Sequence, residues 1–360
     1  MTAQERWLAR RLEHAQLGAE AASALGLAGY RREQLYRAAT RELVDSLEAI
    51  STIPQSLRRT LAEAGFALES LAPRELRRSS DGQTTKALMR LRDGAEVESV
   101  LMEHRNGRTT LCVSSQAGCA FGCAFCATGQ TGFGRNLDPL EIFDQALFFG
   151  RSLRPRGKRI TNVVFMGMGE PFHNYEAVME AVRLLNDPHG FGLGHRHITI
   201  STVGLVPAIE RFAGEGLQVN LAISLHAPTD AIRSQIMPVG RRYPLGALME
   251  ACVRYVARTN RKIFFEYVML AGINDGDAEA RALAELMRGR LYHVNLIPYN
   301  ATPLAGGIRG TAEPRIRAFQ KILDAAGVPT TVRTPMGRDI AAACGQLRAE
   351  AQPRATASLA

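Results

Sequence analysis

The N-terminal fifth of the chain carries leucines at intervals close to whole turns of an α-helix. These are Leu8, Leu12, Leu17, Leu35, Leu43, Leu47, Leu57 and Leu61. Pro54 is suited to the start of a helix, and Gly65 is suited to its end. The pattern predicts a small helical accessory domain over residues 1–72.

The next segment, residues 73–108, changes to the alternating pattern of β-strands. The Asp-Gly pairs at 81–82 and 93–94 are typical of hairpin turns, and residues 85–91 between them alternate. Residues 97–102 can pair with that strand across the second turn. The pattern predicts an antiparallel β linker, in the form of a hairpin, between two domains.

From residue 109 onward, apolar runs of strand length alternate with stretches of helix length. The predicted strands are 109–114, 161–166, 197–201, 218–225, 263–269 and 292–298. The predicted helices are 139–152, 174–186, 205–214, 245–259 and 277–288. A last helix near 313–325 and a strand near 328–333 follow, and residues 349–360 are expected to form a disordered tail. Six such units predict an α/β fold over residues 109–348, with a parallel sheet arranged as an open, partial barrel.

Composition adds a full core and a basic surface to this picture. The chain has 360 residues, of which 46% are hydrophobic, and its formal net charge is +9. An acidic partner such as RNA is therefore plausible. A local basic peak at residues 151–159 fits a solvated loop and a phosphate-contacting edge equally well. The first residues lack an apolar segment and no apolar run is long enough to cross a membrane, so we expect a cytoplasmic protein without a membrane span.

Three cysteines close together carry the strongest chemical signal. Cys119, Cys123 and Cys126 have the spacing Cys-x3-Cys-x2-Cys on a glycine-containing segment. Three thiolates on one loop can hold three irons of a cubic 4Fe–4S cluster and leave the fourth iron open for a substrate. This spacing resembles that of enzymes that use S-adenosylmethionine (SAM) as a radical source.

Three other interpretations compete for the same cysteines. Structural zinc needs four ligands, and His104 is the residue that could complete such a site. A disulfide would require an oxidising compartment, which the composition does not suggest. Three unrelated buried thiols are a poor fit, because buried structural cysteines do not cluster at ligand spacing.

Small polar groups follow the apolar strands. Gly169 and Glu170 follow the second strand of the α/β region, and Ser201 ends the third. The segment 224–226 (Ser-Leu-His) ends the fourth strand, and Asn300 follows the sixth. Each one alone is a common strand cap. Because parallel strands present their carboxyl ends at one edge, together these groups predict a shared cavity beside the cysteine loop.

Six motifs in order make the chain resemble the radical SAM adenine methyltransferase family of the RlmN type. They are the cysteine loop, Gly-Met-Gly-Glu-Pro at 167–171, Ser-Leu-His-Ala-Pro at 224–228, Asn-Leu-Ile-Pro-Tyr-Asn at 295–300, Ala-Ala-Cys-Gly-Gln-Leu at 342–347, and residues 78–82 together with the strand at 97–100. The resemblance covers roughly residues 30–348. It implies an open six-unit barrel that methylates C2 of one adenine in 23S ribosomal RNA, at the peptidyl transferase centre, and an adenine in the tRNA anticodon arm.

The resemblance also implies roles for single residues. One SAM would methylate Cys344, and a second SAM on the cluster would give a 5′-deoxyadenosyl radical that activates this methyl group. Cys112 would then release the product by forming a disulfide with Cys344, and Glu98 would accept a proton. On the residues alone, Glu98 would be an ordinary charge on the exposed face of a strand. The SAM contacts implied are Gly169, Glu170, Ser201, Ser224, Leu225, His226 and Asn300.

The same resemblance extends to partners and alternatives. It implies protein-free or early-assembly 23S RNA and tRNA as substrates, a flavodoxin-type electron donor and a monomeric enzyme. A sister group that methylates C8 of the same adenine is the nearest alternative. An alternative of another class is a noncatalytic RNA-binding protein with a structural metal, which would need none of Cys112, Cys344 and Glu98.

Overall fold

The computed structural model describes residues 1–18, 21–302 and 306–347. The predicted tail at 349–360 lies outside these described residues. One sheet of ten strands forms the centre of the molecule, in the order β1-β2-β3-β4-β7-β8-β9-β10-β11-β12. Neighbours from β4 to β12 are parallel, whereas β1 to β4 are antiparallel. Because the order ends at β1 and β12 within the described residues, the sheet is an open partial barrel, as predicted.

The strands of the sheet follow the apolar runs of the sequence. Their bounds are β1 Leu71–Arg78, β2 Thr84–Leu91, β3 Glu96–Glu103, β4 Thr109–Cys112, β7 Asn162–Phe165, β8 Ile198–Thr202, β9 Asn220–Ser224, β10 Ile263–Met269, β11 Tyr292–Pro298 and β12 Thr330–Val332. All six strands predicted for the α/β region are confirmed to within two residues at each end. Strands buried on both faces are mostly apolar, which is why these runs identify them.

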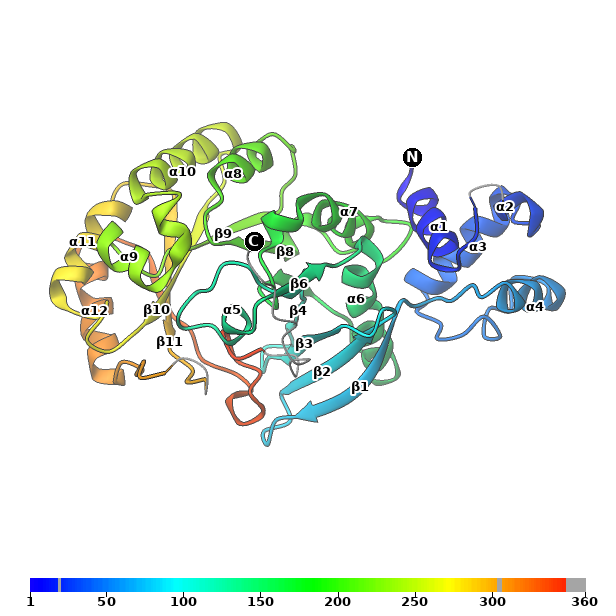
Figure 1. The fold of residues 1–360 in the computed structure, drawn as a ribbon, viewed down its shortest axis with the longest axis horizontal. Helices are drawn as coiled ribbons and strands as arrows, with labels where there is room; N and C mark the ends of the chain where they lie inside the picture. The colour runs from blue at the N-terminus through cyan, green and yellow to red at the C-terminus, as the bar shows by residue number, and fades with distance from the viewer. Residues whose placement is uncertain (19–20, 303–305, 348–360) are drawn as a thin grey trace, which may run out of the picture.

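The helices of the α/β region form the outer layer around the sheet (Figure 1). They are α6 Pro139–Leu153, α7 Tyr175–Asn186, α8 Val206–Ala213, α10 Leu245–Thr259, α11 Asp277–Met287 and α12 Glu313–Ala325. Asp138 caps α6 through a capping box with Glu141. The predicted helices are thus confirmed. The sequence analysis missed four short elements: α5 Ala127–Thr131, α9 Asp230–Ile236, and the two-stranded sheet of β5 Gln116–Gly118 and β6 Phe133–Asn136.

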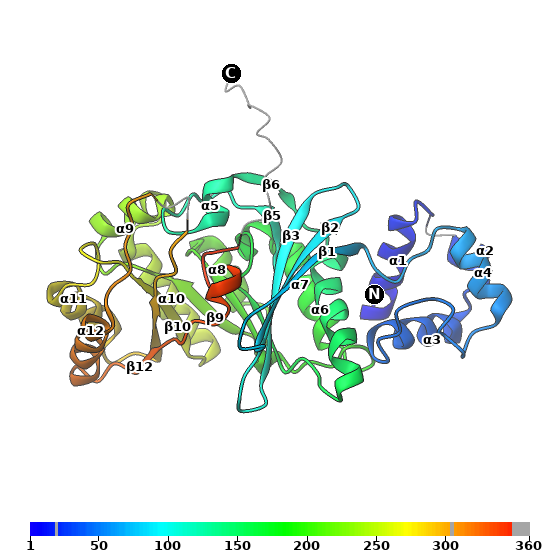
Figure 2. The ribbon, with the colours of Figure 1, turned by 90° about the horizontal axis from the view of Figure 1, so that it is seen from below.

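The antiparallel strands β1 to β3 are not a separate linker in space. They continue the main sheet, because β3 pairs with β4 and Val100 lies opposite Cys112. The buried residues of β2 and β3 supply the apolar face that this junction requires. Figure 2 shows the three strands crossing in front of the barrel next to the C-terminal segment.

The helical region at the N-terminus lies at one end of the molecule (Figure 2). Its helices are α1 Ala3–His14, α2 Ala21–Ala24, α3 Gly29–Thr40 and α4 Gln55–Glu63. Trp7 packs edge-on against Tyr36 and Phe66 in its small core. A buried ion pair between Arg11 and Asp144 connects α1 to α6. The helical character is confirmed, while the boundary at residue 72 stays a prediction, since β1 begins at Leu71.

Candidate active site

The cysteine loop follows the carboxyl end of the first parallel strand. It begins after β5, where Gly118 has a φ of +83° and approaches the carbonyl of Gly132, the residue before β6, too closely to tolerate a Cβ atom. The loop ends at Cys126, the residue before α5. The short sheet and helix thus fix both ends of the segment that carries Cys119, Cys123 and Cys126.

The three thiols share one partly buried environment. Burial raises the pKa of all three, that of Cys119 to about 12, and neighbouring loop cysteines raise the pKa values of Cys119 and Cys123 further. Backbone amides of Thr128 and Gly129 oppose this effect at Cys126, and that of Phe121 does so at Cys119. Three thiolates here therefore need a bound cation to stabilise them, and amide-to-sulfur hydrogen bonds are typical of iron–sulfur sites.

This donor set fits a cubic cluster better than a single ion. Within residues 1–18, 21–302 and 306–347, no three His, Cys, Asp or Glu side chains are placed to hold one metal ion. In a 4Fe–4S cluster each thiolate binds a different iron, so the three sulfurs need not converge on one point. His104, the candidate fourth zinc ligand, instead forms a hydrogen bond of 3.1 Å with the Thr110 hydroxyl.

The C-terminal segment packs directly against the cysteine loop. The amide of Ala127 donates to the Gly345 carbonyl at 2.8 Å, and the Thr128 hydroxyl donates to the Leu347 carbonyl at 2.6 Å. Asn300 donates from Nδ2 to the Cys344 carbonyl at 3.2 Å. These contacts hold Cys344 beside the loop while its side chain stays exposed.

Cys112 and Cys344 lie near opposite ends of the α/β region in the sequence but within electrostatic reach of each other in the fold. Cys112 ends β4 and is buried, and both cysteines are free thiols. Burial raises the pKa of Cys112, and the Cys344 sulfur raises it further, which places the two sulfurs within electrostatic reach. Desolvation by the surrounding protein raises the pKa of Cys344 even though the residue remains accessible to solvent. Glu266 adds to this effect and Arg333 opposes it.

Glu98 is buried within β3 rather than exposed, so the alternative of an ordinary surface charge is wrong. Its carboxylate lies 2.9 Å from the ammonium group of Lys86 on the neighbouring strand β2. Lys86 was not predicted from the sequence. The available signal was Glu98 itself, the one charged residue in the run 97–102, because a buried charge requires a partner.

Gly169 and Glu170 lie where the sequence places them, at the end of β7. A Cβ atom on Gly169, whose φ is +97°, would lie 2.5 Å from the Cβ of Gln116. The buried Glu170 carboxylate accepts hydrogen bonds from the amides of Phe172 at 2.9 Å and Val203 at 2.7 Å. Burial nevertheless raises the pKa of Glu170 to about 7. Such a carboxylate would be stabilised by a bound ammonium group.

The ends of β8 and β9 meet beside this carboxylate. The hydroxyls of Ser201 and Ser224 are 3.5 Å apart. His226 is buried with a φ of +58°, and its Nδ1 accepts a hydrogen bond from the Val268 amide at 3.0 Å. Burial lowers the pKa of His226 to about 3, so the ring is neutral and carries its proton on Nε2. The His226 ring packs edge-on against the ring of Phe125, with the two ring centroids 4.7 Å apart. This contact joins the end of β9 to the cysteine loop.

Two further predicted contacts lie at the same edge. Leu225 is buried, and its amide donates to the Glu266 carbonyl at 3.1 Å. The Asn300 Oδ1 atom accepts from Arg338 Nε at 2.6 Å, so both ends of this amide contact the C-terminal segment. The predicted residues are thus brought together at one edge of the sheet. Their contacts with SAM stay a prediction.

A second charged group in the barrel was missed by the sequence analysis. The buried carboxylate of Glu266 on β10 accepts from Asn295 Nδ2 at 2.9 Å and lies 3.3 Å from Arg333. The Glu in the apolar run 263–269 was the signal for it. The Glu266 carboxylate and the Arg333 guanidinium are thus both close enough to influence the pKa of Cys344.

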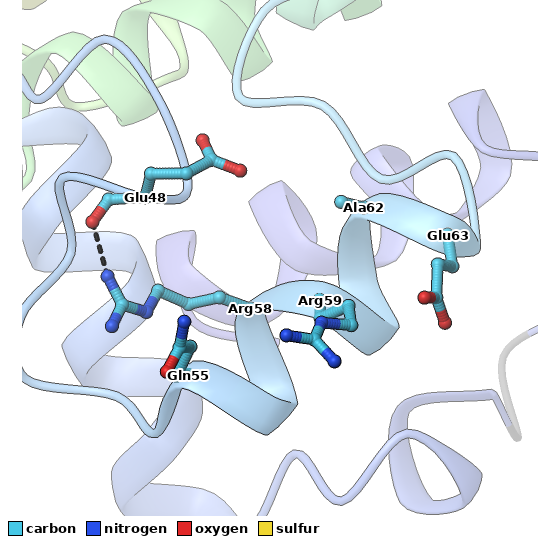
Figure 3. A pocket seen from close by; sticks show the side chains of 6 residues that line it. All are labelled: Glu48, Gln55, Arg58, Arg59, Ala62 and Glu63. Carbon is cyan, nitrogen blue, oxygen red and sulfur yellow. Dashed lines mark hydrogen bonds between the residues drawn. The ribbon is translucent and has the colours of Figure 1, made fainter.

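Two other polar regions do not join this site. In the basic peak at 151–159, Arg156 and Lys158 both pair with Glu103, so part of its charge is neutralised. A surface hollow on α4, shown in Figure 3, belongs to the helical accessory region. Its lining mixes both charges and comprises Glu48, Gln55, Arg58, Arg59, Ala62 and Glu63.

An open parallel sheet with a three-cysteine loop at its carboxyl edge defines a radical SAM enzyme. In agreement, the Radical SAM superfamily model matches residues 113–284. This class uses SAM and a 4Fe–4S cluster, and the loop described above fits that cluster. No helix in the described part of the chain is long and apolar enough to cross a membrane.

Comparison with known proteins narrows the class. The chain is 50% identical, over 89% of its length and 88% of the relative's, to a probable dual-specificity RNA methyltransferase RlmN of Chloroflexus aurantiacus. It is 47% identical to RlmN 1 of Myxococcus xanthus, with 94% and 93% covered. A radical SAM methyltransferase from Sphaerobacter thermophilus, 47% identical, superimposes with a TM-score of 0.88 over 97% of this chain and 98% of that one. The chain belongs to the RlmN family of SAM-dependent RNA methyltransferases.

Proposed function

We propose that this enzyme methylates C2 of a specific adenine in 23S ribosomal RNA, and an adenine in tRNA, by way of a methyl group carried on Cys344. The observation that carries the proposal is the position of Cys344. This exposed thiol is hydrogen-bonded through its own segment to the cysteine loop and lies within electrostatic reach of Cys112. C2 of adenine is electrophilic, like the methyl group of SAM, so a direct transfer between them is chemically mismatched. A carrier thiol at the position of Cys344 removes this mismatch.

Cys344 supplies the nucleophile that C2 of adenine cannot. Its thiolate would take the methyl group of one SAM by displacement, leaving S-adenosylhomocysteine. Arg333 favours this thiolate, whereas burial and Glu266 disfavour it. When bound, the cluster held by Cys119, Cys123 and Cys126 supplies the electron that splits a second SAM, so one turnover consumes two SAM molecules.

Glu98 and Cys112 would complete the reaction on the RNA base. A hydrogen atom would pass from the methyl group on Cys344 to the 5′-deoxyadenosyl radical of the second SAM, and the resulting methylene radical would add to C2. One electron would then leave the adduct, which balances the electron that split SAM, and Glu98 would accept the proton from C2. The Cys112 thiolate would then attack the Cys344 sulfur, so that a disulfide forms as the bond from that sulfur to the methylene carbon breaks. That carbon takes up a proton and becomes the methyl group. Glu98 and Cys112 are both buried, and this burial would keep water from these steps.

The remaining polar groups would bind SAM. Glu170 would meet the ammonium group of its methionine part, beside the open backbone at Gly169. Ser201, Asn300 and the segment 224–226 would line the rest of the cavity. The shared edge of the sheet supports this proposal, as does the raised pKa of Glu170, which a bound cation would lower again.

The partners follow from the same reaction. The relatives are named dual-specificity RNA methyltransferases, and we propose as the two substrates 23S RNA that is protein-free or early in assembly and tRNA. A flavodoxin-type donor would supply the electron. The enzyme would act as a monomer in the cytoplasm.

One experiment tests the product. Anaerobically reconstituted enzyme, SAM and a reductant are incubated with unmodified 23S RNA, and the nucleosides are resolved by mass spectrometry against standards. 2-Methyladenosine is expected. 8-Methyladenosine would assign the enzyme to the C8 group. Absence of both products, from protein with a full cluster that cleaves SAM, would refute 23S RNA as the substrate. The noncatalytic alternative predicts a colourless protein without SAM cleavage.

A further inference from the structure

Lys86 is a buried cation that contacts two parts of the proposed machinery at once. Its side chain is almost fully buried on β2. The ammonium group lies 2.9 Å from the Glu98 carboxylate and donates to the Ala341 carbonyl at 3.2 Å. An ammonium group carries three donors on a flexible stem and can therefore bridge two acceptors on different segments.

The Ala341 carbonyl belongs to the loop that leads to Cys344. Ala341 has a φ of +51°, a left-handed conformation that a residue with a Cβ atom adopts only when its surroundings hold it there. The β1–β2 hairpin provides those surroundings. The Ser80 amide donates to Asp339 at 2.7 Å, and the Thr84 side chain fills the space in which Gly337 could not carry a Cβ atom.

From these contacts we infer that Lys86 is a positioning residue that places the proton acceptor Glu98 and the Cys344 loop relative to each other. The inference rests on the proposed function of these two residues. Lys86 fixes the position of the Glu98 carboxylate through the ion pair, and the same ammonium group fixes the loop through Ala341. A buried ion pair that served stability alone would need no second contact with the Cys344 loop.

The test compares four full-length proteins, each loaded with its cluster, with the wild type. Lys86→Met removes the cation but keeps an apolar stem. Lys86→Met combined with Glu98→Gln leaves no unpaired buried charge and so protects the experiment against misfolding. Glu98→Gln alone is the third. Arg90→Met is the matched control, because Arg90 is an exposed cation on the same face of β2 that pairs with Glu96.

The first measurement needs no RNA. Hydrogen exchange of the 338–347 peptide should become on the order of tenfold faster in both proteins that carry Lys86→Met, since the loop loses a charge-assisted hydrogen bond. Methylation of Cys344 by SAM, followed by peptide mass, should slow by a similar factor in these two. Both quantities should stay at the wild-type level in Arg90→Met. In Glu98→Gln the exchange alone should do so, because this variant keeps the Lys86 contact with Ala341.

The second measurement adds RNA and follows the proton acceptor. Lys86→Met and Glu98→Gln should each leave part of the RNA covalently bound to Cys344, and the double variant should leave no more than Glu98→Gln alone. Wild-type exchange and wild-type Cys344 methylation in both Lys86→Met proteins would overturn the inference. Absence of methylated adenine from the wild-type reaction would instead refute the proposed function, and the exchange data would still decide whether Lys86 places the loop.

Discussion

The backbone amide of Ala127, one residue after the last loop cysteine, donates a hydrogen bond of 2.8 Å to the carbonyl of Gly345, one residue after Cys344. This contact joins the segment suited to hold the cluster to the segment suited to carry the methyl group. In the proposed reaction, a radical formed at the cluster would have to reach the methyl group without meeting solvent. The backbone contact, together with the side-chain contacts of Thr128 and Asn300, fixes the separation of the two segments.

Gly345→Ala tests this junction. Gly345 has a φ of +83°, and a Cβ atom there would contact the Phe125 carbonyl at 3.4 Å. The left-handed backbone should cost about 1–2 kcal/mol for alanine, and relief of that strain would rotate the peptide away from Ala127. We expect methylation of Cys344 by SAM, measured by peptide mass, to slow at least roughly tenfold.

The control for this prediction is Gly327→Ala. Gly327 has a φ of +73° with no atom near the added Cβ, so the backbone strain is similar but remote from Cys344. Equal methylation of Cys344 in the two variants would show that the Ala127–Gly345 contact does not position the thiol.

The pKa of Glu170 predicts a pH-dependent affinity for SAM. Burial raises this pKa to about 7, so the carboxyl group is mostly protonated at about pH 6 and half ionised at about pH 7. An ammonium group binds the ionised form. Affinity should therefore rise roughly fivefold over this interval, in which the SAM amine stays largely protonated. Equilibrium binding of SAM to the cluster-loaded enzyme measures it.

Glu170→Gln supplies the comparison for that measurement. The amide cannot ionise, so the variant should bind SAM more weakly and with almost the same affinity at both pH values. A wild-type affinity that stays constant or falls as the pH rises would contradict the proposed role of Glu170.

Variants of three cysteines separate the proposed steps. Cys344→Ala should abolish both Cys344 methylation and RNA methylation, because the carrier thiol is lost. Cys112→Ala should still accept the methyl group, but it should leave RNA covalently attached to Cys344, because no thiol can attack that sulfur. Denaturing gel electrophoresis detects the adduct. Cys252→Ala is the control, since Cys252 is buried within α10 and should be dispensable for turnover. Full turnover by Cys112→Ala would refute the disulfide step.

The ion pair between Arg11 and Asp144 predicts how firmly the accessory helices are attached. Both side chains are buried, and Asp144 also accepts from the Ser70 amide at 2.7 Å. Arg11→Met leaves a buried carboxylate without its cation, which should lower the free energy of unfolding by about 3–5 kcal/mol. Arg37→Met, which breaks an exposed pair with Glu42, should cost less than about 1 kcal/mol. Thermal unfolding distinguishes the two, and equal losses would contradict the prediction.

Features carried by short stretches of sequence could be predicted from the chain alone. The largely apolar runs at 263–269 and 292–298 identify β10 and β11 to the residue, because a strand buried on both faces is mostly apolar. Cys119, Cys123 and Cys126 lie on one loop, so their spacing is itself the geometry of a cluster site. The short elements α5, α9, β5 and β6 have too few residues to show a period, which is why periodicity missed them.

The tertiary structure decided which distant groups meet. Sequence periodicity describes one element at a time and contains no register between elements. The pairing of Lys86 with Glu98 depends on how β2 aligns with β3, and the contact of Lys86 with Ala341 depends on the path of the C-terminal segment. The burial of Glu98 has the same origin, since a carboxylate on a strand is exposed or enclosed according to what packs over that strand. The sequence alone thus determined the chemical groups and the class of fold, and the packing of the hairpin and the C-terminal segment onto the barrel determined how these groups face one another.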